Sequence, residues 1–163
     1  MFQSKHNEFQ AAIAAQELTP AMLRTCWIAT RVARAIGMEA QDVADVASAI
    51  VFDTIQAQKY GLSENVIHAS AHRDAHWDGK GTPLGLAGND IHIAGRIARL
   101  ASLVEAAYIS GGANCAFAAV MQEASISLDP RLADSFLRLA GSRLFWQALE
   151  SSDLASHISD PVS

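Results

Sequence analysis

The segment HWDGKGTPLGLAGNDIHIAGRIARLASLVEAAY, residues 76–108, decides the fold of this chain. Its first half is rich in glycine and also holds Asp78 and Pro83, residue types that are typical of turns. Its second half places apolar side chains at the spacing of one helical face, and these are Ile93, Ile97, Leu100, Ala101, Val104, Ala107 and Tyr108. The segment therefore predicts a surface loop that leads directly into a buried helix.

Helical spacing continues on both sides of this segment. Thr19 followed by Pro20 predicts a helix start, and Gly37, Gly61 and the pair Gly111–Gly112 predict helix ends. The remaining helices are predicted over residues 20–36, 41–60, 113–124 and 130–139, with a short helix after Ser63 and one or two after Gly141. Because no segment shows the alternation of a strand, the sequence predicts an all-α single domain.

Composition narrows the class of protein. The chain has 163 residues, of which 50% are hydrophobic and 18% charged, so it can bury a core and is not a disordered chain. The net charge is -5 and no basic run is present, which argues against a nucleic-acid surface. Cys26 and Cys115 lie in apolar helical patterns and are predicted to be buried thiols.

Both ends of the chain are polar. The start MFQSKHNEFQ has no signal peptide pattern, and no apolar run approaches the roughly 18 residues that a membrane span needs, so we expect a cytoplasmic protein. We expect an N-terminal helix over 1–18, a helical domain over 19–150, and a tail or linker over 151–163. The ending SHISDPVS indicates a module cut from a longer protein.

The loop carries the candidate chemistry. His72, Asp74, His76 and Asp78 combine imidazole and carboxylate, which suits zinc, iron or manganese. His68, His72 and His76 are four residues apart and would share one face if the helix continued through the loop. The other interpretation is a plain turn with surface side chains. If the loop binds a ligand, the candidate residues are His72, Arg73, Asp74, His76, Asp78 and Lys80.

The segment also resembles the signature of the HD-GYP family, through residues that match in order: Trp77, Asp78, Gly79, Gly81, Pro83, Gly85, Leu86, Gly88, Ile91, Arg96 and Ile97. Upstream, residues 31–53 resemble the two helices that lead to the family's His-Asp pair, and residues 127–140 resemble its Phe-Asp-Pro helix. The resemblance covers about residues 20–140 and implies an HD-domain-like helical bundle. It also implies a metal-dependent phosphohydrolase, since many members of the family cleave cyclic di-GMP.

Several positions depart from the pattern that the resemblance implies. The His-Asp pair is Phe52–Asp53, and the lysine expected three residues after the aspartate is Gln56. The insert that carries two further metal histidines is missing, because only eighteen residues separate Asp53 from His72. The later metal-binding aspartate falls at Ser102, and the tyrosine of the loop is Thr82.

The family's His-His-Glu falls on Arg73–Asp74–Ala75 without a gap, or on 72–74 with one inserted residue. Asp53 thus keeps one ligand position, which we interpret as a structural relic, and His72 is a possible second. Two ligands cannot hold the two or three metals that the family's chemistry uses.

We therefore expect a non-catalytic signalling domain without catalytic residues or a cofactor, which binds a protein partner or a small regulatory ligand and forms a homodimer. The alternative is a metal-dependent phosphohydrolase whose site is rebuilt from Asp53, His72, Asp74 or His76 around iron, manganese or zinc. A third possibility is a structural dimerisation module, in which the alanine-rich helix 113–124 packs across a two-fold axis. Nucleic acid and membrane are not expected partners.

Overall fold

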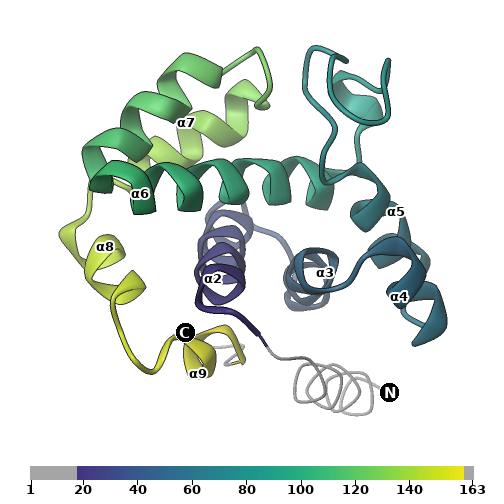
Figure 1. Cartoon of the computed structure of the whole chain (residues 1–163), viewed down its shortest axis with the longest axis horizontal. Helices are drawn as coiled ribbons and strands as arrows, with labels where there is room; N and C mark the ends of the chain where they lie inside the picture. Colours follow the sequence, from purple (N-terminus) through teal and green to yellow (C-terminus); the bar gives the residue numbers. More distant parts are fainter. Residues whose placement is uncertain (1–17, 160–163) are drawn as a thin grey trace.

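The computed structural model describes residues 18–159, and within them the chain is all α-helical without a strand, as predicted (Figure 1). The predicted N-terminal helix over 1–18 lies outside the described residues, apart from Leu18. The elements are α2 (Pro20–Ala35), α3 (Ala40–Val51), α4 (Thr54–Lys59), α5 (Glu64–His72), the 3-10 turn η1 (Gly88–Asp90), α6 (Ile93–Glu123), α7 (Pro130–Leu139), α8 (Arg143–Leu149) and α9 (Leu154–Ser159).

Side chains cap the helix starts that the sequence predicts. The Thr19 hydroxyl accepts the Met22 N–H at 3.1 Å, which satisfies a backbone donor at the start of α2. Ser63 caps α5 in the same way, and Asp129 precedes the proline that opens α7. These predicted boundaries are confirmed.

The helix predicted over 41–60 is wrong, because the structure divides it into α3 and α4. Phe52 is extended, with φ -110° and ψ 132°, and Asp53 begins the second helix. The Asp53 carboxylate accepts the Gln56 N–H at 2.7 Å, while Gln56 Oε1 accepts the Asp53 N–H at 3.1 Å. This reciprocal capping box starts a new helix where the apolar spacing alone predicts a continuous one.

The predicted break at Gly111–Gly112 is confirmed and bends α6 sharply. Gly111 has φ -156° and ψ 17°, and Gly112 has φ 76° and ψ -166°, so neither residue is helical. The positive φ of Gly112 is a conformation that glycine adopts without steric cost. The chain reverses there, and the second part of α6 returns beside α7 (Figure 1).

The expectation that no apolar run reaches membrane-spanning length is corrected by α6. By length and composition it is the one helix among residues 18–159 that is apolar enough to cross a membrane. The stretch 93–110 contains Arg96, Arg99 and Glu105. A segment of α6 that is long enough to span a membrane, roughly 18 residues, and that holds at most two charged side chains must therefore include the bend at Gly111–Gly112.

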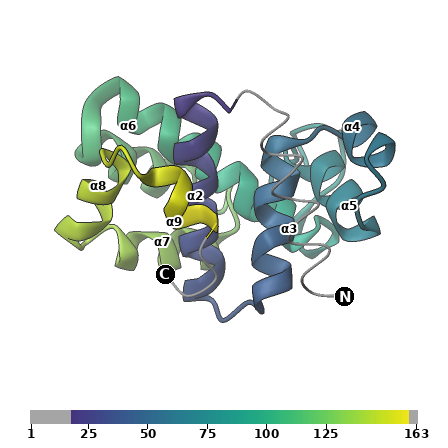
Figure 2. The same ribbon diagram turned by 90° about the horizontal axis from the view of Figure 1, so that it is seen from below.

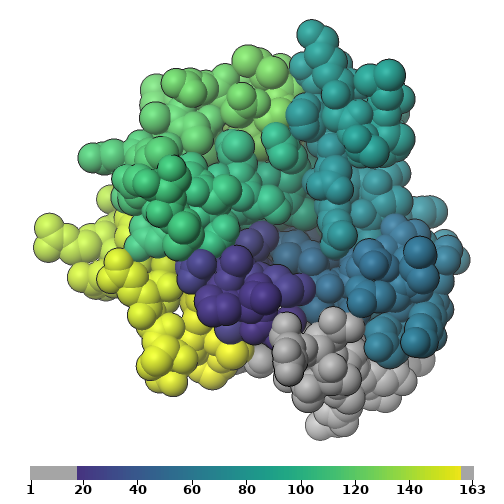
Figure 3. Space-filling model, in the orientation of Figure 1, coloured from purple at the N-terminus to yellow at the C-terminus, as the bar shows by residue number. Residues whose placement is uncertain are grey.

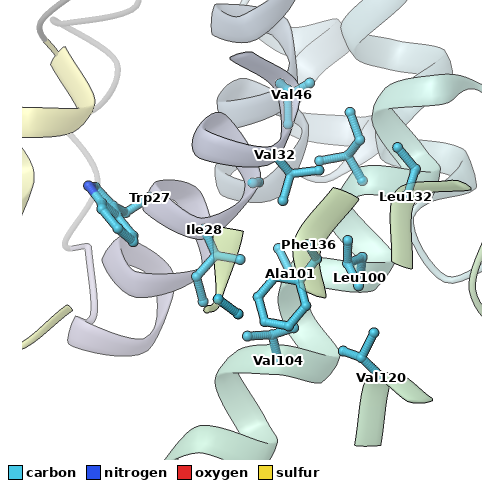
Figure 4. Packing of buried hydrophobic residues seen from close by; sticks show 14 of the residues in the cluster. Trp27, Ile28, Val32, Val46, Leu100, Ala101, Val104, Val120, Leu132 and Phe136 are labelled. Carbon is cyan, nitrogen blue, oxygen red and sulfur yellow. The ribbon is translucent and has the colours of Figure 1, made fainter. Parts of the chain in front are cut away.

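The main core lies where α2 crosses α6 (Figure 4). Its large apolar side chains come from α2, α3, α6 and α7 and include Ile28, Val32, Val46, Leu100, Val104, Val120 and Phe136. A second, smaller cluster between α2, α3, α4 and α5 holds Phe52 together with Cys26. Burial raises the pKa of the Cys26 thiol to about 12, as expected for a buried thiol, whereas Cys115 is only half-buried.

Aromatic residues attach the C-terminal helices to this core. The Trp27 and Phe145 rings lie 4.9 Å apart, and Trp146 stacks on Tyr108 at 5.2 Å. Trp27 and Trp146 are therefore packing residues. The described part of 151–163, predicted as a tail or linker, contains α9, which lies beside α2 (Figure 2) and buries Leu154 in the main core.

Candidate functional site

Backbone hydrogen bonds hold the glycine-rich loop between α5 and α6 in a defined conformation. The N–H groups of Thr82, Gly85 and Gly88 donate to carbonyl oxygens within the loop at 3.0, 2.7 and 2.9 Å. A Cβ atom on Gly81 would lie 2.5 Å from the His76 nitrogen, so only glycine fits there. The loop projects from one corner of the molecule (Figure 1).

A second set of contacts joins the loop to the turn before α7. The N–H groups of Trp77 and Asp78 donate to the carbonyl oxygens of Ser127 and Ile126 at 3.2 and 2.9 Å. The Arg96 guanidinium lies over the Trp77 ring, 5.9 Å from its centre. The loop is therefore part of the folded domain rather than a free surface segment.

Arg96 and Asp129 form a short and largely buried ion pair next to the loop. Arg96 Nη1 lies 2.6 Å from Asp129 Oδ2, and the Asp129 side chain is only 1% exposed. Arg96 Nε also donates to the Ile91 carbonyl at 3.0 Å. Sequence reasoning missed this pair, although Arg96 belongs to the matched pattern and Asp129 directly precedes a proline that begins a helix.

The acidic residues of the loop are exposed. Asp78 accepts the Lys80 N–H at 3.0 Å and so braces the turn, while the Lys80 side chain is exposed to solvent. Asp74 is exposed and its carbonyl oxygen accepts the Thr82 N–H. His76 is half-buried, and its ring lies close to Gly81, where the absence of a side chain leaves room for it.

His72 ends α5 and is hydrogen-bonded to the start of α6. Its Nδ1 accepts the His92 N–H at 2.9 Å, and its ring stacks on that of His68 at 6.4 Å. Burial and then the nearby His68 lower the pKa of His72 below its ordinary value of 6.5. The neutral imidazole therefore accepts at Nδ1 and carries its proton on Nε2.

His92 caps α6 with a similar hydrogen bond. Its Nδ1 accepts the Ala94 N–H at 3.1 Å. Burial lowers the pKa of His92, the neighbouring His72, His68 and Arg96 lower it further, and Asp42 opposes them. Sequence reasoning did not identify this role, for which the place of His92 just before a predicted helix is the available signal.

Arg73 follows His72 and turns its guanidinium toward the end of α3. Its Nη1 lies 3.3 to 3.4 Å from the carbonyl oxygens of Ala49, Ile50 and Phe52. The Ser70 hydroxyl also donates to the Phe52 oxygen, at 2.8 Å. A cation at this end of a helix offsets the partial negative charge of the unpaired carbonyls.

Asp53 is exposed, although the helix predicted over 41–60 would place it at the border of an apolar stripe. The reason is that α3 ends before it, so the side chain no longer follows the spacing of that helix. The partner of its carboxylate is the Gln56 N–H, at 2.7 Å.

The structure brings only some of the predicted residues together. His68 and His72 share a face of α5, but α5 ends at His72 and leaves His76 in the loop. Ser102 lies exposed on α6. Within residues 18–159, no group of three or more histidine, cysteine, aspartate or glutamate side chains is placed to hold a metal ion.

Comparisons with known proteins agree with this fold. The HD domain family matches residues 46–132, which is more than half of the chain. A crystal structure described as a cyclic GMP-AMP specific phosphodiesterase of V. cholerae (V-cGAP3) is similar, with a TM-score of 0.79 and 16% identity over 86% of this chain. The chain spans about half of that protein, since it covers 48% of its length. No curated protein matches the sequence.

Proposed function

The chain belongs to the HD domain family, and from that premise we propose that it is a non-catalytic regulatory domain that has lost its metal centre and binds a ligand or a protein partner. The observation that carries the proposal is the contact between the Arg73 guanidinium and the carbonyl oxygens at the end of α3. In the ungapped alignment to the HD-GYP pattern, Arg73 stands at the first histidine of His-His-Glu.

A fixed positive charge at this position opposes a metal ion. Two like unit charges about 4 Å apart repel by about 4 kcal/mol at an effective dielectric constant of about 20. Arginine stays protonated at all accessible pH values, so this repulsion cannot be removed by proton loss. The guanidinium instead makes the contacts to the α3 carbonyls that tie α5 to α3.

The neighbouring positions support the same proposal. Phe52 replaces the histidine of the His-Asp pair and is fully buried, with its ring packed edge-on to Tyr60 at 5.7 Å. The Asp53 carboxylate is engaged in capping α4. Ser102 stands where the HD-GYP pattern has an aspartate. A neutral serine hydroxyl is a poorer ligand for a divalent metal than a carboxylate is.

The tautomer of His72 supports it as well. A histidine binds metal through an unprotonated ring nitrogen, and the Nδ1 lone pair of His72 already accepts the His92 N–H. Binding through Nε2 would require that hydrogen bond to break or the ring to lose its last proton. The residues at these positions thus do not fit a centre of two or three metals, and we derive no reaction through one.

The proposed ligand surface is the braced loop, with His72, Arg73, Asp74, His76, Asp78 and Lys80 as the tentative contact residues. Because a structurally similar protein is described as acting on cyclic GMP-AMP, cyclic dinucleotides are the first ligands to test. The proposal includes a cytoplasmic location, no cofactor, and neither nucleic acid nor membrane as a partner.

Metal analysis and turnover assays test the proposal together. Protein purified without chelator should contain substoichiometric iron, manganese and zinc by mass spectrometry. It should not hydrolyse cyclic GMP-AMP or cyclic di-GMP when manganese or iron is added. Calorimetry with the same nucleotides then separates ligand binding from a purely protein-binding role.

The alternative is a phosphohydrolase with a rebuilt site around Asp53, His72, Asp74 or His76. Stoichiometric metal with turnover that Asp53→Ala abolishes would establish it and overturn the proposal. Gln56→Ala is the matched control, because it disturbs the same capping box without removing a candidate ligand.

A further inference from the structure

One stretch of the chain carries no charge although it is largely at the surface. Residues 106–122 contain no aspartate, glutamate, lysine or arginine, whereas 18% of the whole chain is charged. The stretch surrounds the bend at Gly111–Gly112 and includes most of the returning part of α6. Solvent-exposed helices normally carry charged side chains on the face that points away from the core.

The exposed side chains of this stretch are uncharged, and we call them the elbow surface: Ala106, Ile109, Ser110, Asn114, Ala118, Met121 and Gln122. Ile109 is 59% exposed and Met121 is 66% exposed, so two large apolar side chains face solvent. Figure 3 shows the green segment around residues 100–120 on the outside of the molecule, with no other segment in front of it. Apolar exposure of this kind marks interaction surfaces.

The acidic residues at the two borders are held by internal partners. Glu105 pairs with Arg24 at 2.9 Å and its side chain is 13% exposed. Glu123 accepts a hydrogen bond from the Ser127 hydroxyl. The borders therefore add little free charge to the elbow surface.

We propose that the elbow surface binds a second copy of this chain across a two-fold axis. Two copies that each carry a net charge of -5 repel one another, so their contact is most favourable where neither copy is charged. In a two-fold contact each surface meets itself, and side chains with both a donor and an acceptor can pair with their own copy. Asn114 and Ser110 are of this kind, and the alanines let two helices approach closely.

Other occupants fit the elbow surface less well. Helices that lie on membranes combine an apolar face with lysine or arginine, and this chain has neither between Arg99 and Arg131. A charged peptide would find no side chain of opposite sign within the stretch. This proposal does not depend on the regulatory function proposed above, since it concerns a different surface.

Sedimentation velocity on the full chain over a concentration series tests the proposal. The wild type should be a dimer, and Ile109→Glu and Met121→Glu should each raise the dimer dissociation constant by about 100-fold or more, because each buries an unpaired charge. The matched control is Leu144→Glu on α8, which is 74% exposed and lies outside the elbow surface, and it should leave the constant unchanged. Circular dichroism confirms that each variant is folded.

Three results would overturn the proposal. The first is a wild type that remains monomeric at several hundred micromolar. The second is a dimer that Leu144→Glu weakens as much as Ile109→Glu and Met121→Glu do. The third is flotation of the wild type with lipid vesicles, lost in Ile109→Glu, without self-association, which would assign the surface to lipid.

Discussion

Replacing Arg73 by methionine removes the guanidinium from the end of α3 and keeps an unbranched side chain. The three contacts of 3.3, 3.4 and 3.4 Å come from a single nitrogen, so we count them as one charge-assisted hydrogen bond. Such a bond contributes about 1.5–3 kcal/mol, and a cation at a helix end adds about 0.3–1 kcal/mol. Because the side chain is half-buried and the contacts are long, we expect a loss of about 2 kcal/mol.

Urea denaturation followed by circular dichroism measures this loss, and thermal unfolding checks it. For a chain of this size, about 2 kcal/mol corresponds to a fall in Tm of about 4–8 °C. The matched control is Arg138→Met, since Arg138 is 81% exposed and forms only a surface pair with Asp134 at 2.7 Å. That substitution should cost less than about 0.5 kcal/mol.

Equal losses from Arg73→Met and Arg138→Met would refute the reasoning, because the guanidinium would then contribute nothing at the end of α3. A second refutation would be a lower Tm of the wild type in EDTA. A metal that binds only the native state stabilises it by mass action, so its removal must lower the Tm.

Three further predictions test the neighbouring residues. Asp53→Asn should change the Tm little, because asparagine also caps helices, whereas Asp53→Ala should cost about 1 kcal/mol by urea denaturation. Gly81→Ala should cost about 1–3 kcal/mol, because its Cβ would overlap the backbone at 2.5 Å, while Gly141→Ala, whose nearest neighbour is at 3.4 Å, should be close to neutral. The pKa of His72 is lowered on folding, so unfolding takes up a proton. Stability should therefore be complete above pH 6.5 and fall as the pH drops below it, with a smaller fall in His72→Gln; an identical pH profile would contradict this.

Local signals predict most of the helix boundaries of this chain. Thr19 and Asp129 precede prolines, and the Gly111–Gly112 pair interrupts a long apolar helix, so each boundary is encoded within a few residues. The break before Asp53 is also encoded locally, by the capping box with Gln56. It was missed because the apolar spacing of α3 runs on through the break.

The candidate site is harder to predict, because its decisive contacts join distant parts of the chain. The loop residues were found from glycine, aspartate and histidine content, but the partners of Arg73 lie 21 to 24 residues away. Arg96 and Asp129 are 33 residues apart. Such pairs depend on how helices pack, and helical spacing carries no information about which side chains meet.

The hydrogen bonds from Trp77 and Asp78 to the turn before α7 have a consequence for how signature motifs are used. They connect the glycine-rich loop, which precedes α6, to the turn between α6 and α7. The ion pair between Arg96 and Asp129 connects the start of α6 to the same turn. Gly81 and Asp78 therefore have structural roles in this loop whether or not any reaction takes place nearby. A match to this motif therefore indicates a fold, and assigning chemistry to such a match requires a separate look at the positions where the HD-GYP pattern has metal ligands, which by the resemblance correspond to 52–53, 73 and 102 in this chain.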